Sequence, residues 1–167
     1  MDVTIRAAHP TEYGTLGEIT AQAYLQDGLL AFGGEDDWYL HELRDVAKRA
    51  AGAEVLVAVD RDRVLGGVTY VPAPGPLSDL AAPDEAEIRM LAVAREARGR
   101  GAGEALVRAC VERARAAGRT GLVLSTQPSM RAAHRVYGRL GFVRAPARDW
   151  RPIEGDDFTL LAYQLTL

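Results

Sequence analysis

Hydrophobic and polar positions along the chain follow two patterns, one typical of strands and one typical of helices. Short apolar or alternating stretches predict strands, and apolar residues that recur every three or four positions predict helices. The predicted strands cover residues 3–7, 54–59, 64–71, 86–93, 121–126, 142–144 and 158–166. The predicted helices begin at Pro10 and at residue 39, and two more cover 103–117 and 128–140.

The order of these elements favours one fold class. Read along the chain it is β-α-α-β-β-β-α-β-α-β-β. Runs of consecutive strands mixed with single helices predict an α/β fold with a mixed sheet of six to seven strands and four helices, rather than a doubly wound parallel sheet. No repeat, linker or low-complexity tract interrupts the pattern, so we expect residues 1–167 to form a single domain.

Turn-forming residues separate the elements. The charged turn at residues 60–63 joins the second and third strands into a hairpin. Four prolines, at positions 72, 74, 76 and 83, predict an irregular loop that ends near Asp84. Gly33-Gly34 and Gly52 are predicted to bound the second helix.

Composition narrows the classes of function. Cys110 is the only cysteine among 167 residues, which excludes an intramolecular disulfide and a multi-cysteine metal site. Neither a secretory signal nor an apolar run long enough to cross a bilayer is present, so we expect a cytoplasmic protein without a membrane partner. The three histidines are scattered, and no metal site is predicted.

Charge is unevenly distributed. The net charge is −3, and every basic residue except Lys48 is an arginine. Many arginines lie between Arg89 and Arg119, which indicates either an anion-binding segment or simply a genome that prefers arginine codons. The acidic net charge argues against nucleic acid as a partner, and such a partner would require steeply salt-dependent binding.

A glycine-rich turn lies between a predicted strand and the long helix that follows. It reads Arg98-Gly99-Arg100-Gly101-Ala102-Gly103. Glycines permit positive φ and close approach of a ligand, and the helix start offers unpaired N–H groups to an anion. Together with the two arginines they predict a pyrophosphate-binding cradle; the alternative is a solvated structural turn.

Two common phosphate-binding motifs do not fit this turn. A nucleotide P-loop needs Lys and Ser or Thr after the last glycine, where Glu104-Ala105 stand. The dinucleotide fingerprint needs a glycine at position 104.

The turn resembles the signature of the GNAT acyltransferase superfamily: Arg or Gln, two residues, Gly, one residue, then Gly or Ala. Arg98, Gly101 and Gly103 match it. The preceding segment 88–93 is similar to that family's fourth strand, and segment 133–142 is similar to its second motif, which ends in Leu-Gly-Phe. One departure is Met130, which stands where the family often has a coenzyme-contacting Asn.

The resemblance implies that the protein uses acetyl-CoA, without a metal, and transfers its acetyl group to a primary amine by direct attack in a ternary complex. It also implies a GNAT-like fold with splayed central strands, in which a bulge lets backbone amides polarise the acetyl carbonyl. The implied coenzyme-binding residues are Leu91, Ala92, Val93, Arg98, Gly99, Arg100, Gly101, Ala102, Gly103 and Ala133.

Two residues match the family's catalytic positions. Tyr137 would protonate the departing thiolate; its alternative role is that of a core tyrosine on one stripe with Ala133 and Leu140. Glu87 would accept the proton of the amine; alternatively it is a solvated strand-end carboxylate or a partner of Arg89. Period-2 alternation places Glu87 on one face with Arg89, Leu91 and Val93. Cys110 lies on an apolar helical stripe and is expected to be buried rather than nucleophilic, and His134 is expected on the helix surface.

The acceptor is not identified by the sequence; a small molecule, a protein lysine and a protein N-terminus all remain open. Its binding region is expected from Tyr24, Phe32, Glu35, Asp36, Asp37, Trp38, the proline loop and Trp150. A larger acyl donor, a homodimer and a non-catalytic acyl-CoA sensor with the same fold also remain open.

Overall fold

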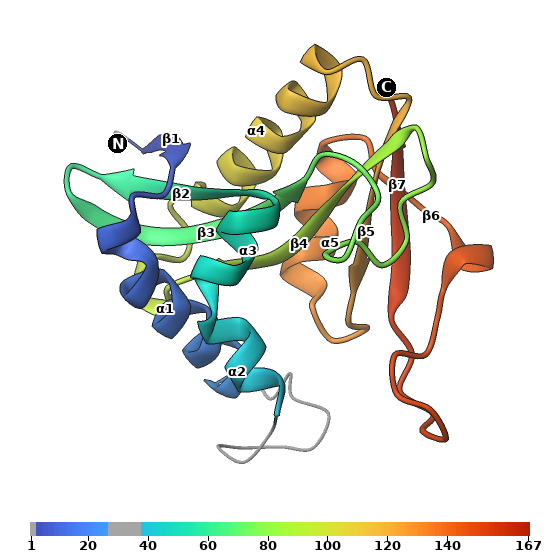
Figure 1. Cartoon of the computed structure of the whole chain (residues 1–167), viewed down its shortest axis with the longest axis horizontal. Helices are drawn as coiled ribbons and strands as arrows, with labels where there is room; N and C mark the ends of the chain where they lie inside the picture. Colours follow the sequence, from blue (N-terminus) through green and yellow to red (C-terminus); the bar gives the residue numbers. More distant parts are fainter. Residues whose placement is uncertain (1–2, 27–37) are drawn as a thin grey trace.

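Seven strands form one mixed sheet in the computed structural model, which describes residues 3–26 and 38–167 (Figure 1). The order across the sheet is β1-β2-β3-β4-β5-β7-β6. All neighbouring strands are antiparallel except β4 and β5. The strands are β1 (Thr4–Ala7), β2 (Glu54–Asp60), β3 (Arg63–Val71), β4 (Glu85–Val93), β5 (Gly121–Thr126), β6 (Val143–Arg144) and β7 (Leu161–Thr166). The predicted mixed α/β sheet is confirmed.

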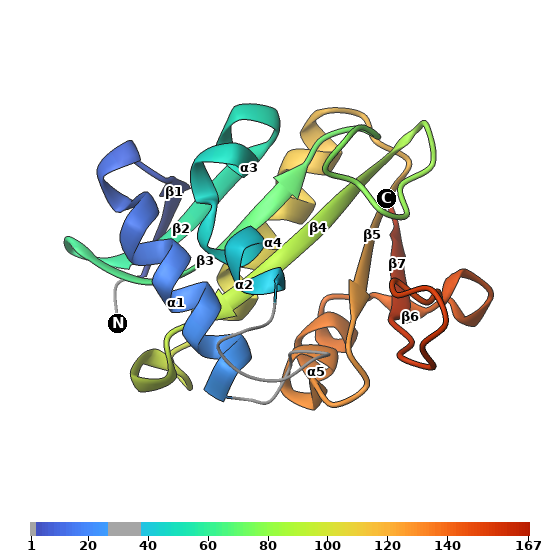
Figure 2. The same ribbon diagram turned by 60° about the horizontal axis from the view of Figure 1, so that its bottom comes forward.

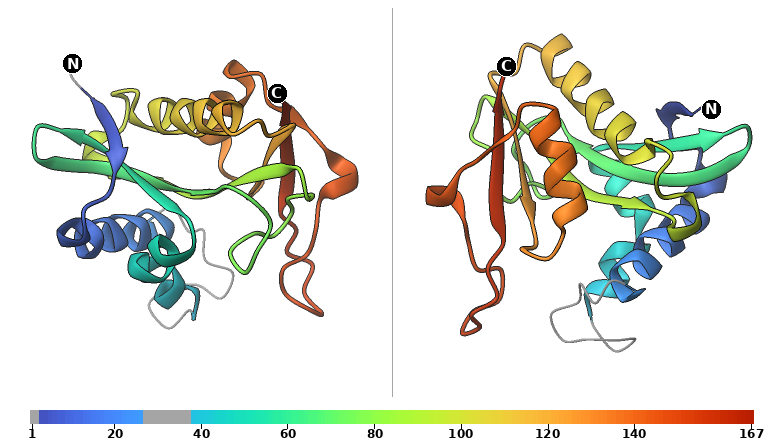
Figure 3. Two further views of the ribbon diagram at one scale, coloured as in Figure 1. Left: turned by 45° about the horizontal axis from the view of Figure 1, so that its top comes forward. Right: turned by 180° about the vertical axis from the view of Figure 1, so that it is seen from behind.

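Helices cover both faces of this sheet (Figure 3). One face carries α1 (Tyr13–Gln26), α2 (Tyr39–Arg44) and α3 (Val46–Gly52), and the other carries α4 (Ala102–Ala116) and α5 (Arg131–Arg139). Single 3₁₀ turns are η1 (Pro10–Glu12), η2 (Arg95–Ala97) and η3 (Pro146–Arg148). Leu106, Cys110 and Tyr137 share one apolar cluster, so α4 and α5 pack together on their face.

The predicted second helix is divided in two, so the described residues hold five α-helices instead of four. Asp45 leaves helical geometry, with φ −85° and ψ 66°, and its carboxylate accepts a hydrogen bond from the Lys48 N–H. A short acidic side chain at this point caps a new helix start, which competes with continuation of the old helix. Gly33 and Gly34 lie outside the described residues.

The central strands diverge, as the family resemblance implied. Pairing between β4 and β5 runs from Glu85 opposite Gly121 to Ile88 opposite Leu124 and stops there. Beyond Ile88 β4 continues beside β3, whereas β5 continues beside β7 (Figure 2). The wedge between them opens toward α5.

A bulge interrupts β4 at the start of this wedge. The register between β3 and β4 shifts by one residue between Gly67 and Thr69, and Met90 has φ 55°. A positive φ at a non-glycine residue costs about 1–3 kcal/mol and persists only where surrounding structure enforces it.

The bulge overturns one prediction about β4. Leu91 and Val93 pack against the cluster on the α4 face, together with Ile88, whereas Glu87 and Arg89 face the opposite side. The four predicted same-face residues therefore divide into two pairs, because an extra residue in a strand inverts the alternation beyond it.

None of the helices within the described ranges combines the length and the apolar character needed to cross a bilayer.

Candidate active site

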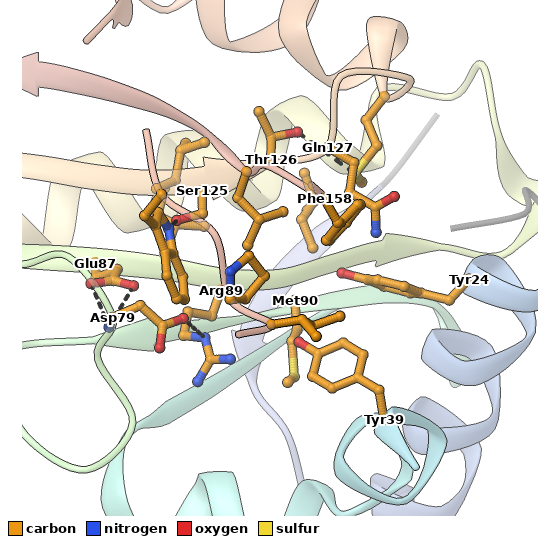
Figure 4. Close-up of a pocket in the computed structure, with 18 of the residues that line it drawn as sticks. Tyr24, Tyr39, Asp79, Glu87, Arg89, Met90, Ser125, Thr126, Gln127 and Phe158 are labelled. Atoms are coloured by element: carbon orange, nitrogen blue, oxygen red, sulfur yellow. Dashed lines mark hydrogen bonds and ion pairs between the residues drawn. The ribbon is translucent and has the colours of Figure 1, made fainter. Parts of the chain in front are cut away.

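A pocket of about 380 Å³ occupies the wedge between β4 and β5. One wall comes from α1 and α2, a second from the proline loop, and a third from the segment 150–160 between β6 and β7. Tyr24 and Tyr39 point into it toward Met90, and Phe158 closes the opposite side (Figure 4). Segments far apart in the sequence thus meet where the two strands separate.

Glu87 is fully buried at the polar end of this pocket. Its Oε1 accepts hydrogen bonds from the backbone N–H groups of Asp79, Leu80 and Ala81, at 3.1, 2.7 and 2.9 Å. Oε2 accepts one, from Asp79 at 3.0 Å (Figure 4). Burial raises the pKa of Glu87, and these N–H donors oppose the rise. The carboxylate is therefore neither solvated nor the ion-pair partner of Arg89, the two alternatives to a catalytic role.

Because Glu87 holds the proline loop, we expect Glu87→Gln to destabilise the fold. The substitution keeps the side-chain shape but turns an amide NH₂ toward backbone donors, and an unsatisfied buried donor costs about 1–3 kcal/mol. For a chain of this size the melting midpoint falls by several degrees in thermal unfolding.

The matched control is Glu96→Gln, because Glu96 is 68% exposed and lies 3.8 Å from Arg63. Exposed pairs of this kind contribute little, so its melting point should stay at that of the parent protein. Equal melting points for Glu87→Gln and the parent protein would contradict the anchoring role.

Arg89 and Asp79 form an ion pair beside Glu87. Arg89 Nε lies 3.3 Å from Asp79 Oδ2, and Nη1 donates to the Leu77 carbonyl at 2.9 Å. Both residues line the pocket. Two β4 side chains thus hold the same loop. Glu87 binds its backbone N–H groups, and Arg89 binds the Leu77 carbonyl and the Asp79 carboxylate.

Tyr137 lies at the apolar end of the pocket and is 3% exposed. Its ring packs against Phe142 and Tyr163, with centroid distances of 5.8 and 5.7 Å. Burial raises its pKa, so the phenol stays protonated at neutral pH. Tyr137 is therefore both a core residue and a pocket residue that holds a proton.

The glycine-rich turn adopts the geometry that its sequence predicts. Gly99 and Gly101 have φ 82° and 81°, and nothing would lie within 4 Å of a Cβ at either position. The first bond of α4 runs from the Ala105 N–H to the Gly101 carbonyl, and no side chain caps the helix. The N–H groups of Ala102, Gly103 and Glu104 consequently have no partner within the helix, which favours an anion at this end.

The two arginines of the turn lie in different environments. Arg100 Nη2 donates to Asp60 Oδ2 at 2.6 Å, which draws its guanidinium toward the end of β2. Arg98 is exposed. Leu91 and Val93 face the same side of the sheet as α4, Ala92 is buried in β4, and Ala133 is half-buried on α5. Their contact with a coenzyme stays a prediction.

Other candidate residues lie apart from this chemistry. Cys110 is fully buried, which confirms the predicted burial, and burial raises the pKa of its thiol to about 12. His134 is half-buried rather than on the surface, because its Nε2 lies 3.1 Å from the Gln127 carbonyl and 3.3 Å from Thr126 Oγ1. Among the described residues, no group of three His, Cys, Asp or Glu side chains is arranged to hold a metal ion.

The residues expected to bind the acceptor coincide with the pocket only in part. Tyr24, Trp38 and Trp150 line the pocket as expected, and Asp79 represents the proline loop. Phe32, Glu35, Asp36 and Asp37 lie outside the described residues. Sequence reasoning missed Tyr39, Arg89 and Phe158 as pocket residues; the aromatic and charged character of these positions was the only available signal.

A mixed sheet whose central strands splay beside a bulge, followed by an uncapped glycine-rich helix start, is the arrangement that the family resemblance implied. The sequence profile of the acetyltransferase (GNAT) family matches residues 19–142, and the chain belongs to this family. Its activity is accordingly acetyl transfer.

Solved structures resemble this one over nearly their whole length. yncA from Salmonella typhimurium, solved with its cofactor acetyl-CoA, has a TM-score of 0.72 at 20% identity, over 99% of this chain and 94% of that one. The paiA N-acetyltransferase of Thermoplasma acidophilum, in complex with coenzyme A, has a TM-score of 0.75 at 13% identity, over 100% of both chains. A ribosomal-protein-alanine N-acetyltransferase from Brucella melitensis has a TM-score of 0.73 at 22% identity, over 98% of this chain and 99% of that one. No curated protein matches the chain in sequence.

Proposed function

We propose that this protein transfers the acetyl group of acetyl-CoA to a primary amine, by direct attack of the amine within a ternary complex. The observation that carries the proposal is the single wedge between β4 and β5, where the bulged strand, a protonated tyrosine and a buried carboxylate line one pocket. The uncapped start of α4 lies on the face of β4 opposite to Glu87. The side chain of Val93 reaches it, because a Cβ at Gly103 would lie 3.6 Å from Val93 Cγ2.

The coenzyme binds, in this proposal, along β4 and the start of α4. Its pyrophosphate accepts hydrogen bonds from the free N–H groups after Gly101 and is favoured by the positive end of the helix dipole. The pantetheine arm follows the backbone of Leu91, Ala92 and Val93 into the wedge. Ala133 on α5 contacts the coenzyme from the other side of the wedge.

Two proton transfers accompany the reaction. The amine must lose a proton to become a nucleophile, and the thiolate that leaves must gain one. Glu87 is the proposed acceptor: its Oε2 accepts one hydrogen bond whereas Oε1 accepts three, which leaves a lone pair on Oε2. Tyr137 is the proposed donor, because its phenol is held in the neutral form.

Titration calorimetry with acetyl-CoA, followed by a thiol-release assay with amines, tests the proposal. We expect micromolar binding of acetyl-CoA, no binding of NAD, and release of free coenzyme A thiol when an amine is added. Desulfo-CoA, which lacks the thioester, serves as the comparator that measures binding to the glycine-rich turn alone. Binding without thiol release from any amine would favour the sensor alternative, and no binding would mean that the glycine-rich turn is structural.

A further inference from the structure

The pocket is unusually rich in aromatic side chains. The chain has two Trp, six Tyr and three Phe, and six of these eleven line the one pocket. They are Tyr24, Trp38, Tyr39, Tyr137, Trp150 and Phe158. Of the twenty lining residues that the structure describes, only Asp79, Glu87 and Arg89 carry a charge.

Two aromatic walls face each other across this pocket, and both are held in place. On the α1–α2 side, Tyr39 packs edge-on against Tyr24 and Trp38, with centroid distances of 6.1 and 5.5 Å. On the other side, the Trp150 indole N–H donates to Ser125 Oγ at 2.9 Å. Trp150 also pairs through its backbone with Leu160, by bonds of 3.1 and 2.8 Å. Side chains fixed before binding lose little conformational entropy when a ligand enters.

The charged groups that the structure describes in this pocket leave room for one further cation at most, at the remaining lone pair of Glu87 Oε2. Arg89 and Asp79 pair with each other, and both oxygens of Glu87 accept backbone N–H groups. A polyamine or a lysine-rich peptide presents several cations, and each of them needs a carboxylate or water. The pocket offers apolar surface instead, and aromatic faces that attract a single ammonium group.

Resting on the proposed function, we infer that the acceptor is a small primary amine whose carbon skeleton is aromatic. A volume of about 380 Å³ lies at the lower end of the range for ligand pockets, which suits a compact metabolite rather than a long chain. The ring enters between the two walls, and the amine is directed toward the polar end at Glu87.

Competition among amines in the thiol-release assay tests this inference. The panel is 2-phenylethylamine, ethylamine, spermidine and a lysine-containing peptide, each with saturating acetyl-CoA. We expect kcat/KM for 2-phenylethylamine to exceed that for ethylamine by about tenfold or more, because burial of an aromatic ring is worth at least that factor. Product mass confirms transfer to the amine.

Variants of Trp150 test whether this aromatic wall causes the preference for an aromatic amine. Trp150→Ala should lower kcat/KM for 2-phenylethylamine about tenfold more than that for ethylamine, because the aromatic ring loses contact surface that ethylamine does not use. Trp150→Phe retains a ring and should retain the preference, whether or not the bond to Ser125 matters. Val143→Ala, at a 57% exposed position outside the pocket, is the control and should match the parent protein.

The failures of the two proposals are distinguishable. Equal or faster turnover of ethylamine, spermidine or the peptide would overturn the aromatic assignment and leave amine acetylation standing. Equal loss with both 2-phenylethylamine and ethylamine in Trp150→Ala would mean that this wall is structural, and would also overturn the assignment. Acetyl-CoA binding without thiol release from any amine would overturn both proposals.

Discussion

Gly103→Glu should raise the dissociation constant for acetyl-CoA by about 100-fold or more while the protein remains folded. The substitution places a negative charge on the helix end that we assign to the pyrophosphate, and like charges about 4 Å apart in a partly buried site repel by several kcal/mol. Calorimetric titration measures the loss directly.

A substitution at Gly103 can change coenzyme binding without destabilising the fold. Gly103 lies inside α4, and a Cβ there would meet Val93 Cγ2 at 3.6 Å, an ordinary contact. A glutamate in the first turn of a helix is itself stabilising, so the melting point should not fall. Gly103→Ala is the matched control and should bind acetyl-CoA like the parent protein. Undiminished binding of acetyl-CoA by Gly103→Glu would contradict the proposal that the start of α4 binds the pyrophosphate.

Tyr137→Phe should lower kcat by about 100-fold and leave acetyl-CoA affinity unchanged, since loss of a general acid costs about 10²–10⁴ in rate. The phenyl ring retains the packing against Phe142 and Tyr163. The hydroxyl makes no hydrogen bond with any residue that the structure describes, so its removal should not change the melting point appreciably.

Steady-state kinetics beside calorimetry distinguishes the acid role from a packing role. A packing role changes affinity and melting point together with rate, whereas an acid role changes rate alone. Equal turnover in Tyr137→Phe and the parent protein would mean that solvent protonates the thiolate. Because burial raises the pKa of Tyr137, activity should not decline between pH 7 and pH 9 through loss of this proton.

The elements with strong local signals were predictable from sequence. The hairpin of β2 and β3 follows from two apolar runs around a charged turn, and β5 was predicted with its observed bounds. The glycine-rich turn was predicted because positive φ at Gly99 and Gly101 is a property of single residues. Tyr137 was found through a motif that is continuous in the sequence.

The remaining features depend on tertiary contacts that leave no local pattern. The bulge at Met90 lies in a strand whose sequence alternates acceptably in either register, so the division of Glu87 and Leu91 onto opposite faces could not be read from it. The buried bonds of Glu87 involve main-chain groups, which any sequence supplies. The wall at Trp150 is positioned by pairing with Leu160, ten residues further along the chain.

The way in which Glu87 holds the proline loop has a consequence for how this site can diversify. Its carboxylate contacts only main-chain N–H groups at positions 79, 80 and 81. Any residue except proline supplies such a group, so this part of the anchoring does not depend on which side chains stand at positions 79–81. Evolution or design can therefore exchange Asp79, which lines the pocket, at the cost of its ion pair with Arg89 but without loss of these backbone bonds.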